Sequence, residues 1–254
     1  MILSKRLSVR IADHYFQEET CPSRVDLHRF LQLSAPRNGA SCEPFHTIEI
    51  DLTQDPKDLL AAMSYQTRYH IRRATDREKL NYEYWGQCSE QQICEFAEFY
   101  DRFAIQTKRA RLRRQRYELL SKHGFLDLSR VSSGGEVLVW HAHYRDPERA
   151  RMLESVSMHR ETADAGHRTF IGRANRYHHW HDMLRFKEAG CKTYDFGGWY
   201  AGKEDQHRLS INGFKEQFGG KVVKHFNCIE GTTFKGKLIA RLLSGGQKSA
   251  VAGL

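Results

Sequence analysis

The sequence lacks the features that mark membrane-spanning, secreted and zinc-binding proteins. No apolar run approaches the ~18 residues that a bilayer-spanning helix needs, and residues 1–10 hold neither an apolar block nor a small-residue cleavage site. The six cysteines include no C-x-x-C pair, so the pattern indicates neither a zinc knuckle nor a disulfide framework. We therefore expect a cytoplasmic protein with free thiols and no bound metal.

Proline is also scarce, and its distribution divides the chain. Four of the five prolines lie at or before Pro56, so the sequence predicts a loop-rich N-terminal segment with a strand, residues 1–44, before an uninterrupted body, residues 45–230. A basic tail, residues 231–254, follows. The net charge of +9 favours anionic partners such as nucleic acid, coenzyme phosphates or acidic lipid, although a basic surface can also serve solubility alone.

The hydrophobic pattern switches between the periods of strands and helices. Alternation predicts strands at Leu7–Tyr15 and Phe45–Leu52, and a helix capped by Asp58 carries an apolar stripe as far as Ala74. Residues 22–44 show no clear period. Beyond them we expect a strand, two helices, three strands, a long helix, a strand, a short helix and a strand, at residues 81–85, 93–104, 117–122, 125–131, 136–144, 151–158, 170–189, 192–196, 214–218 and 222–229.

This order of elements matches that of the GNAT acyltransferase domain. Three stretches are similar to the Fem-like branch of that superfamily, the peptidyltransferases of the peptidoglycan interpeptide bridge: YQTRYHIRRA at 65–74, GRANRYHHW to TYDFGG at 172–198, and INGFKEQFGG at 211–220. The resemblance covers about residues 59–229. It implies an α/β (α+β) fold, a single GNAT-like domain whose mixed, mostly antiparallel central sheet is flanked by helices.

The resemblance also implies where an acyl donor binds. In Fem-like enzymes a Phe-Lys pair lies against the acyl-carrying end of the donor, and Phe214 and Lys215 match it. Two glycines directly after a strand let a ligand approach the backbone, although they also suit an ordinary turn. The predicted donor-binding residues are Arg168, Gly172, Asn175, Gly197, Gly198, Phe214 and Lys215.

Acyl transfer to an amine needs a base for the amine proton and a proton donor for the leaving group. Glu154, on the strand that resembles the central splayed strand of the family, and Asp195, at the end of the neighbouring strand, are the candidate bases. Tyr194 is a candidate proton donor, and Lys215 completes the predicted catalytic set. Polar residues on strands also serve structural hydrogen bonds, and that alternative stays open for each.

Arginines are predicted to bind an anionic acceptor. Arg68 and Arg72 lie in the first basic helix, and Arg111 and Arg114 lie in the densest cationic run, residues 108–116, which could equally be a solvated helix face. His178, His179 and His181 have no third ligand at a convincing spacing, so packing is the preferred interpretation.

These patterns predict an N-acyltransferase that forms an amide on an amine of a cell-envelope, polysaccharide or secondary-metabolite precursor. Acyl-CoA is the preferred co-substrate, because aminoacyl-tRNA-using Fem enzymes generally carry two GNAT-like units and this chain has room for about one. The alternatives are an aminoacyl-tRNA-dependent transferase and a non-catalytic GNAT-like binder of RNA or an anionic polymer. The acceptor is expected to be anionic, and a nucleotide- or lipid-linked amine would fit. The basic tail from Phe234 to Leu243 is expected to be a frayed helix or a membrane or partner contact.

Overall fold

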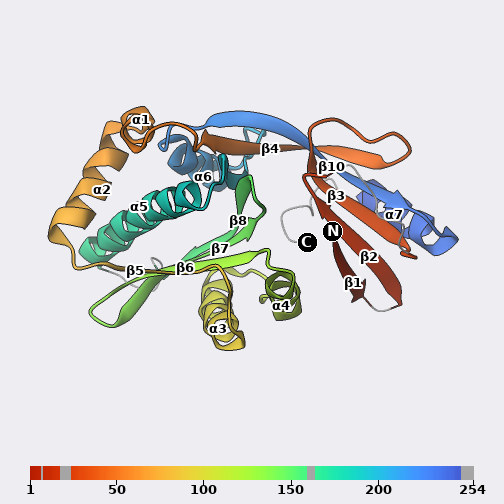
Figure 1. Ribbon diagram of the computed structural model, residues 1–254, viewed down its shortest axis with the longest axis horizontal. Coiled ribbons are helices and arrows are strands. Elements are labelled where there is room, and N and C mark those ends of the chain that lie inside the picture. The colour runs from red at the N-terminus through yellow and green to blue at the C-terminus, as the bar shows by residue number, and fades with distance from the viewer. Residues whose placement is uncertain (7, 18–23, 159–163, 247–254) are drawn as a thin grey trace. The chain divides into compact units, whose positions relative to one another are not determined.

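The computed structural model describes residues 1–6, 8–17, 24–158 and 164–246 (Figure 1). The chain forms two compact units, one made of Met1–Thr47, Gly198–Gly202 and Val222–Leu254, the other of Ile48–Gly197 and Lys203–Lys221. The second unit lies within the predicted acyltransferase body. Among the described helices, none has the length and apolar character needed to cross a bilayer. Leu7 and Cys21, which the predictions included, lie outside the described residues.

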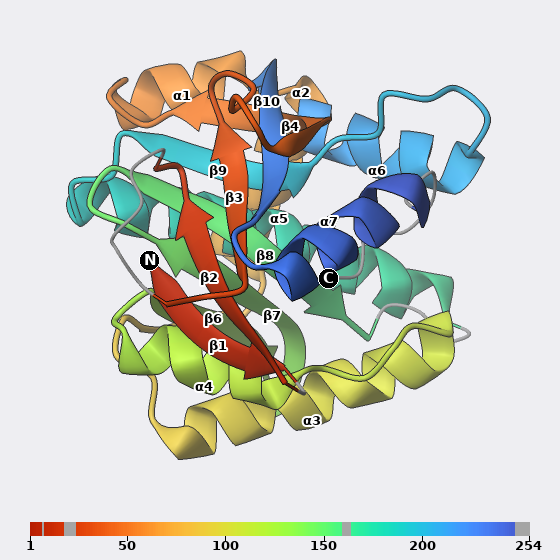
Figure 2. The ribbon, with the colours of Figure 1, turned by 90° about the vertical axis from the view of Figure 1, so that its right-hand side faces the viewer.

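The first unit is built on a small mixed sheet with the strand order β1-β2-β3-β10. β1 pairs with β2 antiparallel, β2 with β3 parallel and β3 with β10 antiparallel. Figure 2 shows β1, β2 and β3 side by side. Helix α7 follows β10, and β4 begins in this unit. The bounds are β1 Ile2–Arg6, β2 Val9–Tyr15, β3 Leu27–Leu33, β4 Ser41–Asp51, β10 Lys221–Gly231 and α7 Phe234–Gly246.

Three details of the first unit differ from the predictions. The strand predicted at Leu7–Tyr15 corresponds to β2, which begins at Val9. Residues 22–44, for which no period was found, contain the strand β3. The strand was hidden because His28 and Gln32, two polar side chains, are buried in it and mask the apolar pattern. Cys42 and Cys228 form a disulfide, so the prediction of free thiols is wrong for them; they lie 186 residues apart, a separation that no local motif signals.

The second unit carries the strand order β9-β8-β7-β6-β5, with antiparallel pairs from β5 to β8 and a parallel β8–β9 pair. The three strands predicted as a meander are therefore adjacent in the sheet, as expected. The bounds are α1 Pro56–Ala62, α2 Tyr65–Arg77, β5 Asn81–Trp85, α3 Glu90–Thr107, α4 Arg114–Lys122, β6 Leu126–Ser133, β7 Glu136–Arg145, β8 Arg149–Ser157, α5 Ala165–Glu188, β9 Thr193–Gly198 and α6 Gln206–Glu216.

One predicted helix is two. The apolar stripe from Asp58 to Ala74 is broken after α1, where Ser64 caps α2 by accepting a hydrogen bond from the Thr67 amide. The cap of α1 is Asp55, because Pro56 takes the first helical position, where a missing N–H costs nothing. The periodicity is the same in one helix or two, and only the Ser64 cap separates them.

Helices cover both faces of the second sheet. α5 packs on β6, β7 and β8 on one face and against α2, whereas α3 and α4 cover the other face (Figure 1). The ring of Trp140, on β7, stacks on Trp85 at 5.5 Å and lies 5.9 Å from the ring of Phe96 on α3. These buried aromatic contacts fix α3 against the sheet.

The parallel pair at the end of this sheet is short. β8 and β9 pair only from Arg149 opposite Thr193 to Arg151 opposite Asp195, although both strands continue beyond that point. On its other side β8 stays paired with β7 as far as Ser157. A bulge interrupts that ladder at Leu153, where Glu154 and Met152 lie opposite the consecutive residues Ala142 and His143. The two strands therefore part beside an irregularity of the type that re-aims side chains.

Candidate active site

The point where β8 and β9 part is closed at its base by a glycine. Gly197 has a φ of +71°, a conformation that L side chains rarely adopt, and a Cβ at this position would lie 2.9 Å from the Met152 carbonyl oxygen. The two backbones thus approach more closely than any other residue type permits. Gly197 therefore sets how closely β9 approaches β8, whereas a Cβ on Gly172, another predicted donor-binding glycine, would meet nothing within 4 Å.

Glu154 lies on β8 beyond the region that pairs with β9, where β8 is still paired with β7. It is partly buried, and burial raises its carboxyl pKa from an ordinary 4.5 to about 7, against the opposing effect of Arg109, Arg116 and Arg151. A hydrogen bond with Tyr117 also favours the charged form. A carboxyl group with this pKa exchanges protons near neutral pH, as a general base must.

Asp195 and Lys215 both contact the backbone of Gly197. The buried Asp195 carboxylate accepts a hydrogen bond from the Gly197 amide at 2.7 Å and lies 3.6 Å from the Arg149 guanidinium. Lys215 Nζ donates to the Gly197 carbonyl oxygen at 3.4 Å. Burial lowers the Lys215 pKa to about 8, although the charge of Asp195 opposes the change. Asp195 therefore supports the glycine turn and the ammonium together.

Arg151 lies near both Glu154 and Lys215. Its charge lowers the pKa values of both Glu154 and Lys215, so it lies within electrostatic range of the candidate base and of the candidate cation. Arg151 is not among the site residues that the sequence predicts. Its position on β8, three residues before Glu154, was the available signal. Arg109 and Arg116 belong to the cationic run at residues 108–116, and the sequence pattern does not predict that they lower the pKa of Glu154.

Tyr194 lies deeper, in a buried polar network. Its hydroxyl lies 2.9 Å from His179 Nδ1 and 3.3 Å from His143 Nε2, and burial raises its pKa well above the ordinary value. The buried Asp182 carboxylate accepts hydrogen bonds from His141 Nδ1 at 2.6 Å and from the hydroxyl groups of Ser129 and Tyr82. This network connects β9 and β7 to α5 in the core of the unit.

Three groups of this network could hold a metal ion. The ligand atoms of His141, His178 and Asp182 lie within 4.8 Å of one another, and His141 is the third residue that the sequence pattern did not supply. The rings of His141 and His178 are, however, stacked at 3.7 Å, and three hydrogen bonds already satisfy Asp182. A buried carboxylate with this many donors is stable without a metal. We therefore treat the cluster as a hydrogen-bond network.

Four of the predicted donor-binding residues, Gly172, Phe214, Asn175 and Arg168, lie at three different places. Arg176, which is not among the predicted residues, connects α5 to α6, since its guanidinium lies 4.9 Å from the Phe214 ring and donates to the Gly172 carbonyl oxygen and to Gln217. Asn175 Oδ1 lies 3.0 Å from His141 Nε2 and so belongs to the buried network. Arg168 lies in the first turn of α5, whose amides at residues 166 and 167 bond to the capping residue Asp164.

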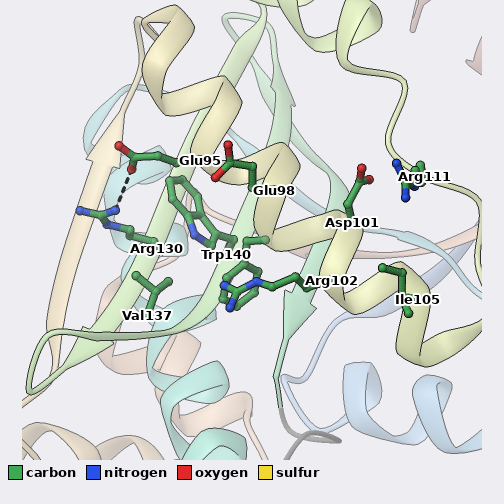
Figure 3. Close-up of a pocket in the computed structure, with 10 residues that line it drawn as sticks. Glu95, Glu98, Asp101, Arg102, Ile105, Arg111, Arg130, Val137 and Trp140 are labelled. Atoms are coloured by element: carbon green, nitrogen blue, oxygen red, sulfur yellow. Dashed lines mark hydrogen bonds and ion pairs between the residues drawn. The ribbon is translucent and has the colours of Figure 1, made fainter.

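The predicted acceptor-binding arginines do not form one cluster. Arg68 donates to the backbone carbonyl groups of Ala61 and Met63, Arg72 is exposed, and Arg114 pairs with Glu118 at 2.7 Å. Arg111 lines an open pocket of about 470 Å³. Figure 3 shows the mixed charge of the pocket, with glutamate, aspartate and arginine side chains around Trp140. The pocket lies on the α3 side of the sheet, and Arg102, Glu98 and Ile105 also line it.

Comparisons with known proteins locate this arrangement among solved folds. No protein-family model matches the sequence, and no curated protein matches it. The structure is similar to that of FemX, with a TM-score of 0.60 and 13% identity over 78% of this chain and 64% of FemX. It is also similar to the C-terminal domain of a putative lysylphosphatidylglycerol synthetase from Agrobacterium fabrum, with a TM-score of 0.54 and 15% identity over 87% of this chain and 74% of that one.

The chain shares its fold with these two structures. The L-PGS structure from Bacillus licheniformis agrees, with a TM-score of 0.52 and 13% identity over 86% of this chain and 73% of that one. The predicted fold class, a mixed and mostly antiparallel sheet flanked by helices, is thereby confirmed. The chain spans less than two thirds of the FemX chain.

Proposed function

We propose that the protein is an N-acyltransferase, which moves an acyl group from an activated donor to an amine and so forms an amide. The observation that carries the proposal is the group at the β8–β9 opening. Glu154, with a pKa near 7, and Lys215, with a pKa near 8, both lie within electrostatic range of Arg151, beside strands that separate. This arrangement offers one proton acceptor and one cation to a carbonyl group entering between the strands.

The chemistry balances with these groups alone. The amine nitrogen attacks the thioester carbonyl carbon, the N–C bond forms, and the Glu154 carboxylate takes the proton that the nitrogen loses. Collapse of the intermediate breaks the C–S bond, and the thiolate takes a proton from the Lys215 ammonium. Tyr194 was predicted to supply that proton. Lys215 is the better acid, because its pKa is about 8 whereas burial raises that of Tyr194 far higher.

The proposed donor is an acyl thioester of coenzyme A. Phe214, with Arg176 over its ring, and Lys215 offer a flat apolar surface and two cations to an anionic coenzyme. The proposed acceptor is an amine on an anionic cell-envelope, polysaccharide or secondary-metabolite precursor. The names of the neighbours, FemX and lysylphosphatidylglycerol synthetase, support an envelope or lipid-linked acceptor.

A second candidate donor is aminoacyl-tRNA. It is supported by the likeness to FemX and by the exposed cationic run between α3 and α4, which would gain from a polyphosphate backbone. Acyl-CoA stays the first proposal, because the Phe214 ring and the Arg176 and Lys215 cations suit the flat base and the phosphates of the coenzyme. The two donors differ enough in size and charge for one binding assay to separate them.

Thermal unfolding in the presence of each donor tests the proposal. A ligand that binds only the folded protein at 100 times its Kd stabilises it by about 2.7 kcal/mol, so acetyl-CoA or a longer acyl-CoA should raise the Tm. Lys215→Ala should abolish this rise, whereas Lys57→Ala, an exposed lysine on α1, should not. A rise with charged tRNA alone would favour the second candidate. If no donor raises the Tm and the protein binds RNA in a salt-sensitive way, the enzyme hypothesis is wrong and the protein is a non-catalytic RNA-binding module.

A further inference from the structure

Helix α7 of the first unit has one face fixed against the sheet. Gly236 lies so close to Asp26, the residue before β3, that a Cβ on it would collide with the Asp26 carbonyl oxygen. Ala240, one turn later, is buried with Ile11 and Leu27. Thr233 fixes the start of the helix, since its hydroxyl accepts from the Gly236 amide and donates to Asp26. The rotation of α7 about its own axis is therefore determined within this unit.

The opposite face of α7 exposes large apolar side chains. Phe234, Leu238 and Leu242 are 88%, 53% and 67% exposed. Residues four apart lie above one another on a helix, so these side chains form one continuous stripe over two turns. A single exposed leucine is ordinary on a protein surface, but three in register on one helix indicate a face that another apolar phase covers.

Cations border this stripe on both sides. At 100° per residue, Lys235 lies on one side of the stripe and Lys237 and Arg241 lie on the other, and all three are exposed. Residues 231–254 contain no aspartate or glutamate. Lys235 also donates to the carbonyl oxygen and the hydroxyl of Ser8, which holds its ammonium beside the helix.

We propose that α7 is a docking helix for the surface of an anionic lipid bilayer. An apolar stripe bordered by lysine and arginine suits the interface, where the side chains of Phe and Leu enter the acyl region and the cations meet lipid phosphates. An RNA partner would use the cations but leave the apolar stripe in water. An apolar groove of a protein would leave the charges of Lys237 and Arg241 without anionic partners unless its rim were acidic. The bilayer satisfies both features, and the proposal does not depend on acyl transfer.

Sedimentation of the full chain with vesicles tests the proposal. The protein should sediment with vesicles of phosphatidylcholine mixed with phosphatidylglycerol and stay in solution with phosphatidylcholine alone. Leu238→Ser should weaken binding roughly tenfold, because one leucine side chain no longer leaves water. The double variant K237Q/R241Q should weaken it by roughly fivefold per charge and reduce its salt dependence.

Tyr65→Ser is the matched control, because Tyr65 is an apolar surface residue with 77% exposure on α2, far along the chain. It should bind vesicles like the unchanged protein, and all variants should keep the same Tm. The proposal is overturned if the protein ignores anionic vesicles, if Leu238→Ser binds as well as the unchanged protein, or if Tyr65→Ser loses as much binding. Binding that disappears in K237Q/R241Q but is unaffected by Leu238→Ser would mean general electrostatic attraction, and it would also overturn the proposal.

Discussion

Replacing Glu154 by glutamine should make the protein more stable and less active. Burial raises the pKa of this carboxyl group from 4.5 to about 7, so the folded protein prefers its protonated form. The stability that this preference gives is complete below pH 4.5 and is lost as pH rises to about 7. At about 1.4 kcal/mol per pKa unit, the charged group costs the fold about 3 kcal/mol at pH 8. Glutamine carries no charge and avoids this cost.

Denaturant unfolding at two pH values measures the effect. At pH 8 the Glu154→Gln variant should exceed the unchanged protein in unfolding free energy by up to about 3 kcal/mol, and at pH 5 by much less. Its acyl transfer rate should fall by about 10²- to 10⁴-fold, the range for loss of a general base. In the unchanged protein the rate should fall as pH drops below 7. Equal stability at both pH values, or full activity in the variant, would refute the assignment of Glu154 as a buried base.

Three further outcomes are expected. Gly197→Ala should destabilise the protein by about 1–3 kcal/mol, because its φ and the nearby Met152 carbonyl oxygen exclude a Cβ, whereas Gly172→Ala, in an open helical position, should stabilise it by about 0.5–1 kcal/mol in the same urea titration. Acyl-CoA affinity, measured by calorimetry, should fall between pH 7 and pH 9 as Lys215 loses its proton near pH 8, and Lys215→Arg should flatten that profile. Cys42→Ser should lower the unfolding free energy by about 2–4 kcal/mol under oxidising conditions and leave it unchanged in the presence of a reductant.

The sequence predicts the second unit well because its signals are local. The strand pair predicted around SSGG at 132–135, the long helix ended before Gly190 and the strand that reaches Gly197 each carry turn or cap residues within the element itself. The first unit lacks such signals. Its strand β3 carries buried polar side chains, so the alternation that identifies a strand is absent.

The site residues also divide into those that local sequence signals predict and those that they do not. Glu154 could be selected because its strand resembles the central splayed strand of the Fem-like family. Arg176 and His141 could not, since their importance depends on contacts with residues that are distant in sequence. His141 lies 41 residues from Asp182, for example, and Arg176 reaches Gln217. No periodicity or spacing rule encodes pairings of this range, so the buried network and the electrostatic environment of Glu154 required the structure.

The central claim is that an activated acyl donor enters between β8 and β9 beside Phe214 and Lys215. Hydrogen–deuterium exchange with and without a non-hydrolysable acyl-CoA analogue tests it directly, because the amides of a strand that contacts ligand exchange more slowly. We predict slower exchange over residues 152–156, 195–198 and 212–216, with no change in the distant β5. Protection confined to other segments, or no protection at a saturating concentration of the analogue, would contradict the account.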